Sequence, residues 1–152
     1  MLTFREKYSN GEKTSVLVHG DLWAGQIFFR NEVDIAGIVD WQAAHLGSPV
    51  EDLFRVLGAG TTSAIRRKLF YPLLDYYYDA MLRLLGANMP FSRDYLNEEI
   101  VHTAPFSCLT VIVSTGVQLN SDDVKKDKRA AEEYIDRCKC FVEDVIKLCG
   151  WQ

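Results

Sequence analysis

The chain has 152 residues, of which 48% are hydrophobic and 25% charged, and its formal net charge is -4. This length is enough for one domain with a hydrophobic core, and the composition is that of a globular protein rather than a disordered or fibrous one. The negative net charge gives no electrostatic basis for binding nucleic acid or an anionic membrane surface, so we expect neither as a partner.

Targeting and metal-binding segments are not expected either. Residues 1–13 are rich in charge and have no apolar core of a signal peptide. The most apolar stretch, residues 106–119, is interrupted by Ser, Thr and Gly and is too short and too polar to span a bilayer. Cys138 and Cys140 have no second cysteine pair and no histidine nearby, which argues against zinc. We expect reduced thiols in a cytoplasmic protein with no membrane span.

The N-terminal residues predict a single strand. Residues 1–13 are interpreted as a solvated, polar lead-in to the single domain that covers residues 1–152. Residues 15–18 (SVLV) predict a short buried strand, which leads directly into His19-Gly20-Asp21.

A β-hairpin is predicted next. Residues 26–30 and 35–39 are strand candidates, and the turn Asn31-Glu32-Val33-Asp34 joins them. Asp40 follows directly after the second strand. The hairpin therefore presents an acidic side chain at its end.

A capped helix is predicted after the hairpin. Ser48 is a good N-cap, Pro49 fits the first helical position, and Glu51 completes a capping box. The helix is expected to run to about residue 57, where the following glycines act as stop signals. Its expected inner face consists of Leu53, Val56 and Leu57.

The second half of the chain predicts only helices. Residues 62–85 have apolar side chains near helical spacing, with Gly86 as the stop signal and Pro72 as a kink or interruption. The expected inner positions of this helix are Ile65, Leu69, Leu73, Tyr77, Met81, Leu84 and Leu85.

Three more helices complete the expected fold. Ser92 caps one that runs to about residue 103, Pro105 starts another, and residues 123–148 form a long amphipathic helix. The expected inner positions of the last helix are Ala131, Tyr134, Ile135, Cys138, Val142, Val145 and Ile146. The predicted fold class is α+β, mostly helical, with a small hairpin against a helical bundle.

Residues 16–55 carry the pattern that points to chemistry. They include VLVHGDLWAGQIFF, IAGIVDWQ and GSPVEDLFR. Asp21 follows a strand, Gln26 comes five positions later, and the hairpin delivers Asp40 nineteen positions beyond Asp21. Phosphoryl transfer needs a carboxylate to orient and deprotonate the attacking hydroxyl, and oxygen ligands to hold magnesium on the nucleotide phosphates. A tight hairpin is well suited to placing two acids of distant sequence position side by side.

These motifs resemble those of choline kinases and aminoglycoside phosphotransferases. HGDLWAGQ resembles the HGDxxxxN catalytic loop, IVDWQ resembles the motif with the metal-binding aspartate, and GSPVEDL resembles the segment that follows it. The combination is most similar to the CHK-like, or ecdysteroid kinase-like, branch. The resemblance implies the C-terminal lobe of a protein-kinase-like fold. It also implies ATP- and Mg²⁺-dependent phosphorylation of a small-molecule hydroxyl.

The resemblance also implies residue roles. Asp21 would be the catalytic base, and His19 would hold the loop in shape through hydrogen bonds. Asp40 would bind magnesium, and Gln26 stands where the family has a magnesium-binding asparagine.

Two further residues would support the loop. Trp23 would pack it onto the helical core, and Asp52 would brace it from the helix behind.

Two departures from the family pattern favour a degenerate kinase. Gln26 is one methylene longer than asparagine, and magnesium demands near-ideal octahedral geometry. The residues before His19 include no glycine-rich loop, and Lys7 and Lys13 lie in the polar lead-in, so no nucleotide-binding N-lobe is expected. We therefore expect poor ATP binding by this chain alone. It would be a fragment, a truncated isoform or a pseudoenzyme, with a face open to a partner that supplies or covers the N-lobe.

Simpler interpretations of the same residues stay open. Asp21 is also a common type of turn residue, and Asp52 also suits the first turn of a helix through its charge. A metal hydrolase built from His19, Asp21, Asp40 and His45 matches no known ligand spacing.

Two alternatives concern binding rather than catalysis. Tyr76-Tyr77-Tyr78 is interpreted as part of a helix, with an aromatic cage for a quaternary ammonium group as the alternative. A non-catalytic, pseudokinase-like interaction domain is the alternative function for the whole chain.

Overall fold

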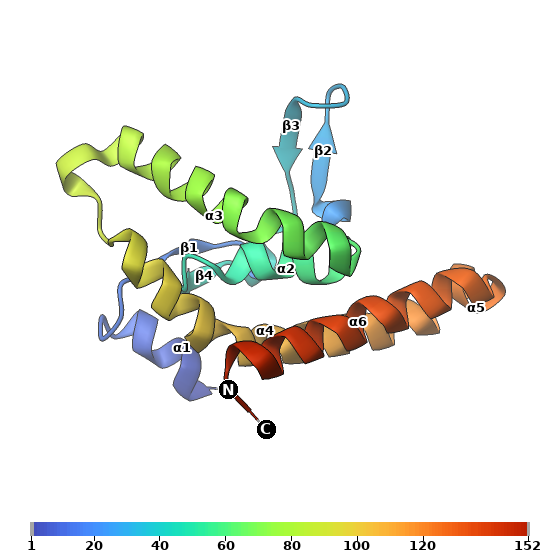
Figure 1. Ribbon diagram of the computed structural model, residues 1–152. Helices are drawn as coiled ribbons and strands as arrows, with labels where there is room; N and C mark the ends of the chain where they lie inside the picture. The colour runs from blue at the N-terminus through green and yellow to red at the C-terminus, as the bar shows by residue number, and fades with distance from the viewer. Residues whose placement is uncertain (1, 152) are drawn as a thin grey trace.

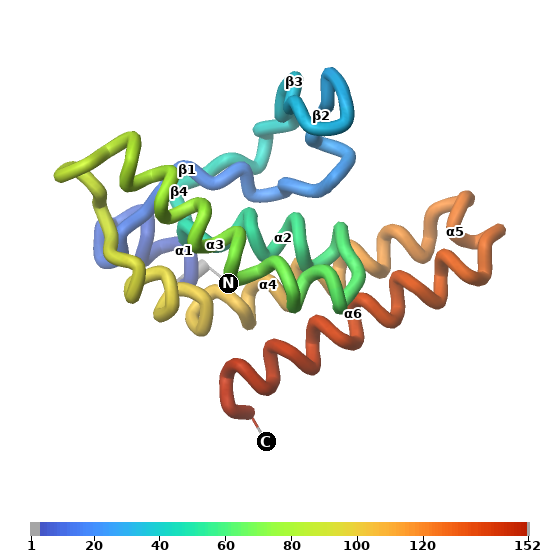
Figure 2. The backbone as a smooth tube through the Cα atoms, turned by 45° about the horizontal axis from the view of Figure 1, so that its top comes forward, coloured from blue at the N-terminus to red at the C-terminus, as the bar shows by residue number. Residues whose placement is uncertain are grey.

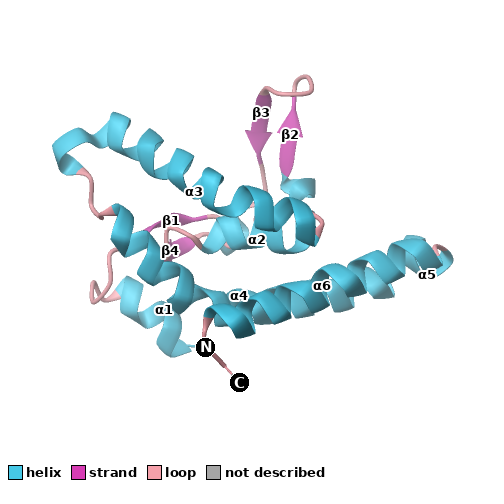
Figure 3. Ribbon diagram, in the orientation of Figure 1, coloured by secondary structure: helices cyan, strands magenta, loops and turns pink. Residues whose placement is uncertain are grey.

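Helices dominate the fold, and two short antiparallel strand pairs accompany them (Figure 1, Figure 3). The computed structural model describes residues 2–151. The helices are α1 (Leu2–Ser9), α2 (Glu51–Gly60), α3 (Ser63–Leu85), α4 (Arg93–Asn120), α5 (Asp122–Lys126) and α6 (Lys128–Leu148). The strands are β1 (Val16–Val18), β2 (Ile27–Phe29), β3 (Ile35–Ile38) and β4 (His45–Gly47). The predicted α+β class with a mostly helical body is confirmed.

Strand pairing places the two ends of the motif region against each other. The predicted hairpin is confirmed as β2 and β3, and it stands away from the helices (Figure 1). The strand β4 is not predicted by the sequence, and it pairs with β1 so that Val18 lies opposite His45. The chain therefore leaves β1, forms the hairpin and returns to β1. This return brings the segment after β3 back beside the loop that follows β1.

The interpretation of residues 1–13 as a solvated lead-in is wrong. Residues 2–9 form α1, and the hydroxyl of the buried Tyr8 donates to Glu99 Oε2 at 2.5 Å. The Phe4 ring stacks on Phe106 with centroids 4.7 Å apart. Phe4 and Tyr8 are four residues apart and therefore share one face of a helix. Two aromatic side chains on one face are enough to anchor this short helix on α4.

The strand at residues 16–18 is present, but it is not fully buried. Val18 is buried, whereas Leu17 is 66% exposed. The strand pairs only with β4, so one of its faces stays open.

The capping box predicted at Ser48 does not form. The helix α2 begins at Glu51, and the Ser48 hydroxyl instead accepts a hydrogen bond from the Thr103 hydroxyl at 2.9 Å. Gly58 lies inside α2 rather than ending it. A Cβ there would come within 2.9 Å of Val111 Cγ2, so this glycine permits close packing of α2 on α4. Of the expected inner face, only Leu57 is buried, together with Phe54.

The first half of the helix α3 faces the core one position away from the predicted register, whereas the predicted Tyr77 does pack against the core. Ile65, Leu69 and Leu73 are exposed, and the buried side chains are Arg66, Phe70 and Leu74. On this face Arg66 donates to Asp144 Oδ2 at 2.6 Å and lies over the Phe141 ring, and Phe70 and Leu74 belong to the core. Pro72 lies inside the helix without ending it.

The helix boundaries of the C-terminal half also differ from the prediction. Ser92 is confirmed as an N-cap and accepts from the Tyr95 N–H at 3.1 Å. The two helices predicted on either side of Pro105 are one helix, α4. The predicted helix 123–148 is divided at Asp127, whose carboxylate caps α6. In α6, Ile135 and Ile146 are exposed, and Phe141 joins Val145 in the core.

The core lies among α2, α3, α4 and α6, and α4 and α6 run side by side (Figure 1, Figure 2). Its fully buried members include Val50, Phe54, Leu57, Leu74, Leu96, Ile100, Ala104, Val111, Phe141 and Val145. Within residues 2–151, α4 is the one helix whose length and composition would allow it to cross a membrane. Of its most apolar window, 33% is buried in the structure, and the helix packs on α2 and α6.

Candidate active site

His19 ties the loop after β1 to the end of the hairpin. It is buried, and its Nε2–H donates to the Val39 carbonyl at 2.7 Å. In this tautomer Nδ1 accepts from the Asp21 backbone N–H at 3.3 Å. Its ring also packs on Trp41, with centroids 4.7 Å apart. Both ring nitrogens are occupied by backbone groups, so the geometry favours a loop-shaping role over proton transfer.

Gly20 allows the close approach of these two segments. Its φ is +84°, in the left-handed region that favours glycine. A Cβ at this position would lie 2.5 Å from the Ala43 carbonyl oxygen. The loop before Asp21 therefore depends on glycine for both its conformation and its contact with the segment after β3.

Gly20→Ala is expected to destabilise the protein by about 3 kcal/mol, since it combines a strained φ with a backbone clash. Gly11→Ala is the matched control, because Gly11 has a φ of +80° but no neighbour within 4 Å. The control should cost only about 1 kcal/mol. Urea unfolding of both variants measures the difference. Equal losses would show that contact with Ala43 does not constrain the loop.

Asp52 contacts the loop from the first turn of α2. Its Oδ2 accepts from the His19 backbone N–H at 2.7 Å, and its Oδ1 accepts from the Gly20 N–H at 3.1 Å. The structure thus places this carboxylate where the motif resemblance expects a brace. It also satisfies two backbone donors that no strand pairs.

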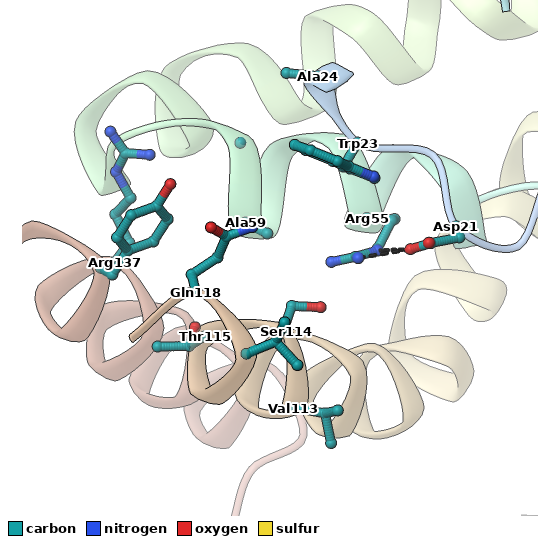
Figure 4. A pocket seen from close by; sticks show the side chains of 13 residues that line it. Asp21, Trp23, Ala24, Arg55, Ala59, Val113, Ser114, Thr115, Gln118 and Arg137 are labelled. Carbon is teal, nitrogen blue, oxygen red and sulfur yellow. Dashed lines mark hydrogen bonds and ion pairs between the residues drawn. The ribbon is translucent and has the colours of Figure 1, made fainter. Parts of the chain in front are cut away.

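Asp21 forms an ion pair that the sequence reasoning missed. Arg55 on α2 donates from Nε and Nη2 to the same oxygen, Asp21 Oδ1, at 3.0 and 2.6 Å (Figure 4). No residue from 2 to 151 donates a hydrogen bond to Oδ2 of Asp21. The signal available in the sequence was that Arg55 lies three positions after Asp52. This spacing places both side chains on the same helix face.

Gln26 and Asp40 lie in direct contact. The Gln26 amide is buried and donates from Nε2 to Asp40 Oδ2 at 2.8 Å, and the Asp40 backbone is left-handed, with φ of 65°. The Gln26 carbonyl oxygen and the second Asp40 oxygen stay available as hard ligands. Magnesium commonly uses one or two protein oxygens and completes its shell with water and phosphate, so this pair fits a minimal magnesium site.

Asp21 and Asp40 lie on adjacent segments but have separate partners. His19 joins the segments through the Val39 carbonyl and the Asp21 N–H, while Arg55 holds the first carboxylate and Gln26 the second. In the described part of the chain, no group of three or more His, Cys, Asp or Glu side chains could hold a metal ion. A metal at Asp40 would therefore need ligands from beyond this set of side chains.

Trp23 does not pack the loop onto the helical core as expected. Its side chain is 39% exposed and folds over Gly25, where a Cβ would collide with the indole ring. The indole instead forms part of the wall of a cavity that opens beside Asp21. Trp23 therefore belongs to the cavity rather than to the core.

A cavity of about 460 Å³ lies between the loop and the helices α2, α4 and α6 (Figure 4). This volume is within the range of small-molecule sites. Apolar and polar side chains line it together with the Asp21 carboxylate. The lining residues are Asp21, Trp23, Ala24, Arg55, Ala59, Gly60, Val113, Ser114, Thr115, Val117, Gln118, Tyr134 and Arg137.

The remaining sequence candidates lie elsewhere. His45 donates from Nδ1 to the Ala43 carbonyl at 2.9 Å and faces the buried Glu51 through Nε2 at 3.3 Å. Burial raises the pKa of Glu51, and His45 opposes that rise. Tyr77 and Tyr78 pack against the core while Tyr76 is exposed, so this run does not surround one ligand site.

Comparison with known proteins gives one match. A family model described as uncharacterized oxidoreductase dhs-27 (DUF1679) matches residues 7–150. The chain belongs to this family. No curated protein and no solved structure matches the chain. The DUF1679 match includes the loop, the hairpin and every residue that lines the cavity, so the candidate site is part of the family domain.

Proposed function

We propose that this chain is the C-terminal lobe of a kinase-like phosphotransferase that phosphorylates a hydroxyl of a small molecule. One observation carries the proposal. The Asp21 loop is tied to the Asp40 segment by His19 and braced by Asp52, and it stands beside a cavity of about 460 Å³. A carboxylate at the wall of a small-molecule cavity, next to a second segment with oxygen ligands, is the arrangement that phosphoryl transfer needs.

In this proposal Asp21 is the catalytic base. Its free Oδ2 accepts the proton of the substrate hydroxyl, while Arg55 fixes the carboxylate through Oδ1.

Gln26 and Asp40 would hold the magnesium ion. Bound Mg²⁺ and ATP would supply the phosphoryl group and neutralise its charge. The Gln26 side chain donates a hydrogen bond to Asp40 Oδ2. One oxygen of the proposed magnesium ligand Asp40 is therefore already engaged by Gln26. We therefore propose that phosphotransfer at this site is slower than it would be with asparagine at position 26.

The family description names an oxidoreductase, and the glycines of this chain do not favour that chemistry. Dinucleotide-binding folds hold the pyrophosphate at a glycine-rich turn between a strand and a helix N-terminus. The turn from β4 to the N-terminus of α2, residues 47–50, contains one glycine, Gly47, and Gly58 and Gly60 lie at the C-terminal end of α2.

Magnesium-dependent ATP consumption with a panel of alcohols tests the proposal. Asp21→Asn and Asp40→Ala are each expected to lower the rate at least about 100-fold, the usual effect of losing a general base or a metal ligand. Asp123→Asn, an exposed change on α5, is the control and should keep the full rate. Equal rates for all four proteins would overturn catalysis by this site.

A non-catalytic interaction domain is the second candidate. Apolar side chains are exposed on both strand pairs and their flanking turns, where a partner would cover them; they are Leu17, Phe28, Phe29, Val33, Ile35, Trp41 and Leu46. Patches of this kind commonly mark interaction surfaces. The same assay separates the candidates, because an interaction domain predicts no ATP consumption above background in any of the four proteins.

A further inference from the structure

The cavity beside Asp21 has an apolar wall and a polar wall. Val113 and Val117 of α4 present apolar surface to it, and Trp23 covers it from the loop. Ser114 and Gln118 add polar groups from α4 (Figure 4). A ligand that fills this space therefore needs an apolar body as well as polar groups.

Two arginines line the cavity, and their charges are balanced differently. Arg55 is neutralised inside the cavity by Asp21, to which it donates twice. Arg137 of α6 pairs through Nη2 with Glu133, which is not among the lining residues. Both arginines are therefore ion-paired, Arg55 by an acid of the cavity wall and Arg137 by the neighbouring Glu133 of its own helix.

Arg137 has hydrogen-bonding capacity to spare. Its guanidinium lies 5.7 Å from the centroid of the Tyr134 ring, which fixes its position. Its Nε is enclosed and has no partner, and no residue from 2 to 151 accepts from Nη1. A guanidinium offers five N–H donors and binds carboxylates and phosphates more strongly than neutral groups. An acid group is thus the ligand feature that suits this end of the cavity.

Asp21 and Arg137 lie at opposite ends of the cavity, with Trp23, Ser114 and Gln118 between them (Figure 4). We infer that the cavity binds an elongated hydroxy acid, with its hydroxyl at Asp21, its chain along the apolar wall, and its anionic group at Arg137. The inference rests on the proposed function for the chemistry at Asp21. It adds the substrate class, which the motif resemblance does not provide.

The anionic group has two chemical sources, a substrate acid or a phosphate of the nucleotide. Both would bind a guanidinium through the same hydrogen bonds. The apolar wall between the two ends favours the substrate acid, because a phosphate chain that ran from Asp21 to Arg137 would place charged oxygens against Val113 and Val117. Hydroxycarboxylates test the first source, and ATP and inorganic phosphate test the second.

Binding is measured by titration calorimetry without nucleotide, using ω-hydroxycarboxylates of four to ten carbons, each paired with the α,ω-diol of equal length. Each acid that spans the cavity is expected to bind at least about tenfold more tightly than its diol, as one charge-assisted hydrogen bond predicts. The preference should peak at one chain length, since the two binding groups sit at fixed positions.

Variants assign the preference to Arg137. Arg137→Gln should remove it by weakening the acid and leaving the diol unchanged, and Arg137→Lys should keep most of it by restoring the charge. Arg67→Gln is the control, because Arg67 is a half-exposed arginine of α3 that pairs with Asp144 outside the cavity. It should leave both affinities unchanged.

Three results would overturn the inference. They are equal affinities of acid and diol at every length, an acid preference that survives Arg137→Gln, and ATP or inorganic phosphate binding that depends on Arg137 while hydroxy acids show no preference. Failure of the proposed function is a different result. Hydroxy-acid binding through Arg137 without ATP consumption would support the hydroxy-acid site and reject the kinase function. Phosphorylation of diols as fast as acids would support the kinase function and reject the hydroxy-acid site.

Discussion

Glu99→Ala is expected to destabilise the protein by about 3–5 kcal/mol, the cost of removing one partner from a buried charged network. The Glu99 side chain is fully buried and accepts from the Lys13 ammonium and the Tyr8 hydroxyl, each at 2.5 Å. Its loss leaves Tyr8 and Lys13 without this acceptor and weakens the attachment of α1 to α4, where the Phe4 ring still stacks on Phe106. Urea unfolding followed by circular dichroism measures the change.

Glu98→Ala is the matched control, because Glu98 is the exposed neighbour of Glu99 on α4. It is expected to change the free energy of unfolding by less than about 0.5 kcal/mol. A loss for Glu99→Ala no greater than that of the control would show that α1 is not anchored through this carboxylate.

The pH dependence of stability gives a second measurement of the same group. Burial raises the pKa of Glu99, but the hydrogen bonds from Lys13 and Tyr8 more than offset this, and the pKa lies below its ordinary value of 4.5. A carboxyl with a lowered folded-state pKa stabilises the protein above its unfolded-state pKa and loses this contribution as the pH falls through the folded-state value. Wild-type stability should therefore decline below about pH 4.5, and Glu99→Gln should flatten that decline.

Asp52→Ala is expected to release the loop that carries Asp21. Two charge-assisted hydrogen bonds, to the His19 and Gly20 amides, are lost together. The free energy of unfolding should fall by about 2–3 kcal/mol. Amide hydrogen exchange at these two positions should become faster, since both protons lose their acceptor. Under the proposed function, ATP consumption falls as well because Asp21 loses its fixed position.

Asp52→Asn provides the graded control for this prediction. Asparagine keeps one carbonyl oxygen, so it can accept from one of the two amides but not from both. Protection from exchange should lie between the wild type and Asp52→Ala. Unchanged exchange at His19 and Gly20 in Asp52→Ala would show that other contacts hold the loop.

The hairpin and the N-cap at Ser92 were predictable because their signals are local. Turn residues between two apolar runs, and a hydroxyl before a helix, act within a few positions of the chain. The strand β4 was not predictable, because its pairing with β1 joins residues about 30 positions apart across the hairpin. Local apolar pattern carries no information about such a partner.

The differences between the predicted and the observed helices have a common physical cause. Long-range packing outweighs local preference at Pro72 and Pro105, where a helix retains its packed flanks despite one missing backbone donor. The buried face of α3 includes Arg66, which pairs with Asp144, 78 positions away. The prediction used the apolar residues alone and therefore placed the neighbouring face of the helix toward the core.

At the candidate site, residues of the recognised motifs were predictable and their partners were not. The contact of Asp52 with the loop agrees with the motif pattern, whereas Arg55 reaches Asp21 across 34 positions. The position of Trp23 against the core was expected from the motif resemblance. Its exposed position follows from the cavity, which leaves no helix surface against the ring.

The hairpin formed by β2 and β3 has consequences for ion binding. Two strands alone make a marginally stable ribbon, so its orientation depends on contacts at its base. Those contacts include the His19 ring to the Val39 carbonyl at 2.7 Å and, between the two legs of the ribbon, the Gln26 amide to Asp40 at 2.8 Å. A divalent ion gripped by Gln26 and Asp40 would restrict the swing of the whole ribbon. The entropy that the ribbon loses would then lower the affinity for the ion. A protein that binds the ribbon tip and restricts it beforehand would raise the ion affinity without contacting the ion.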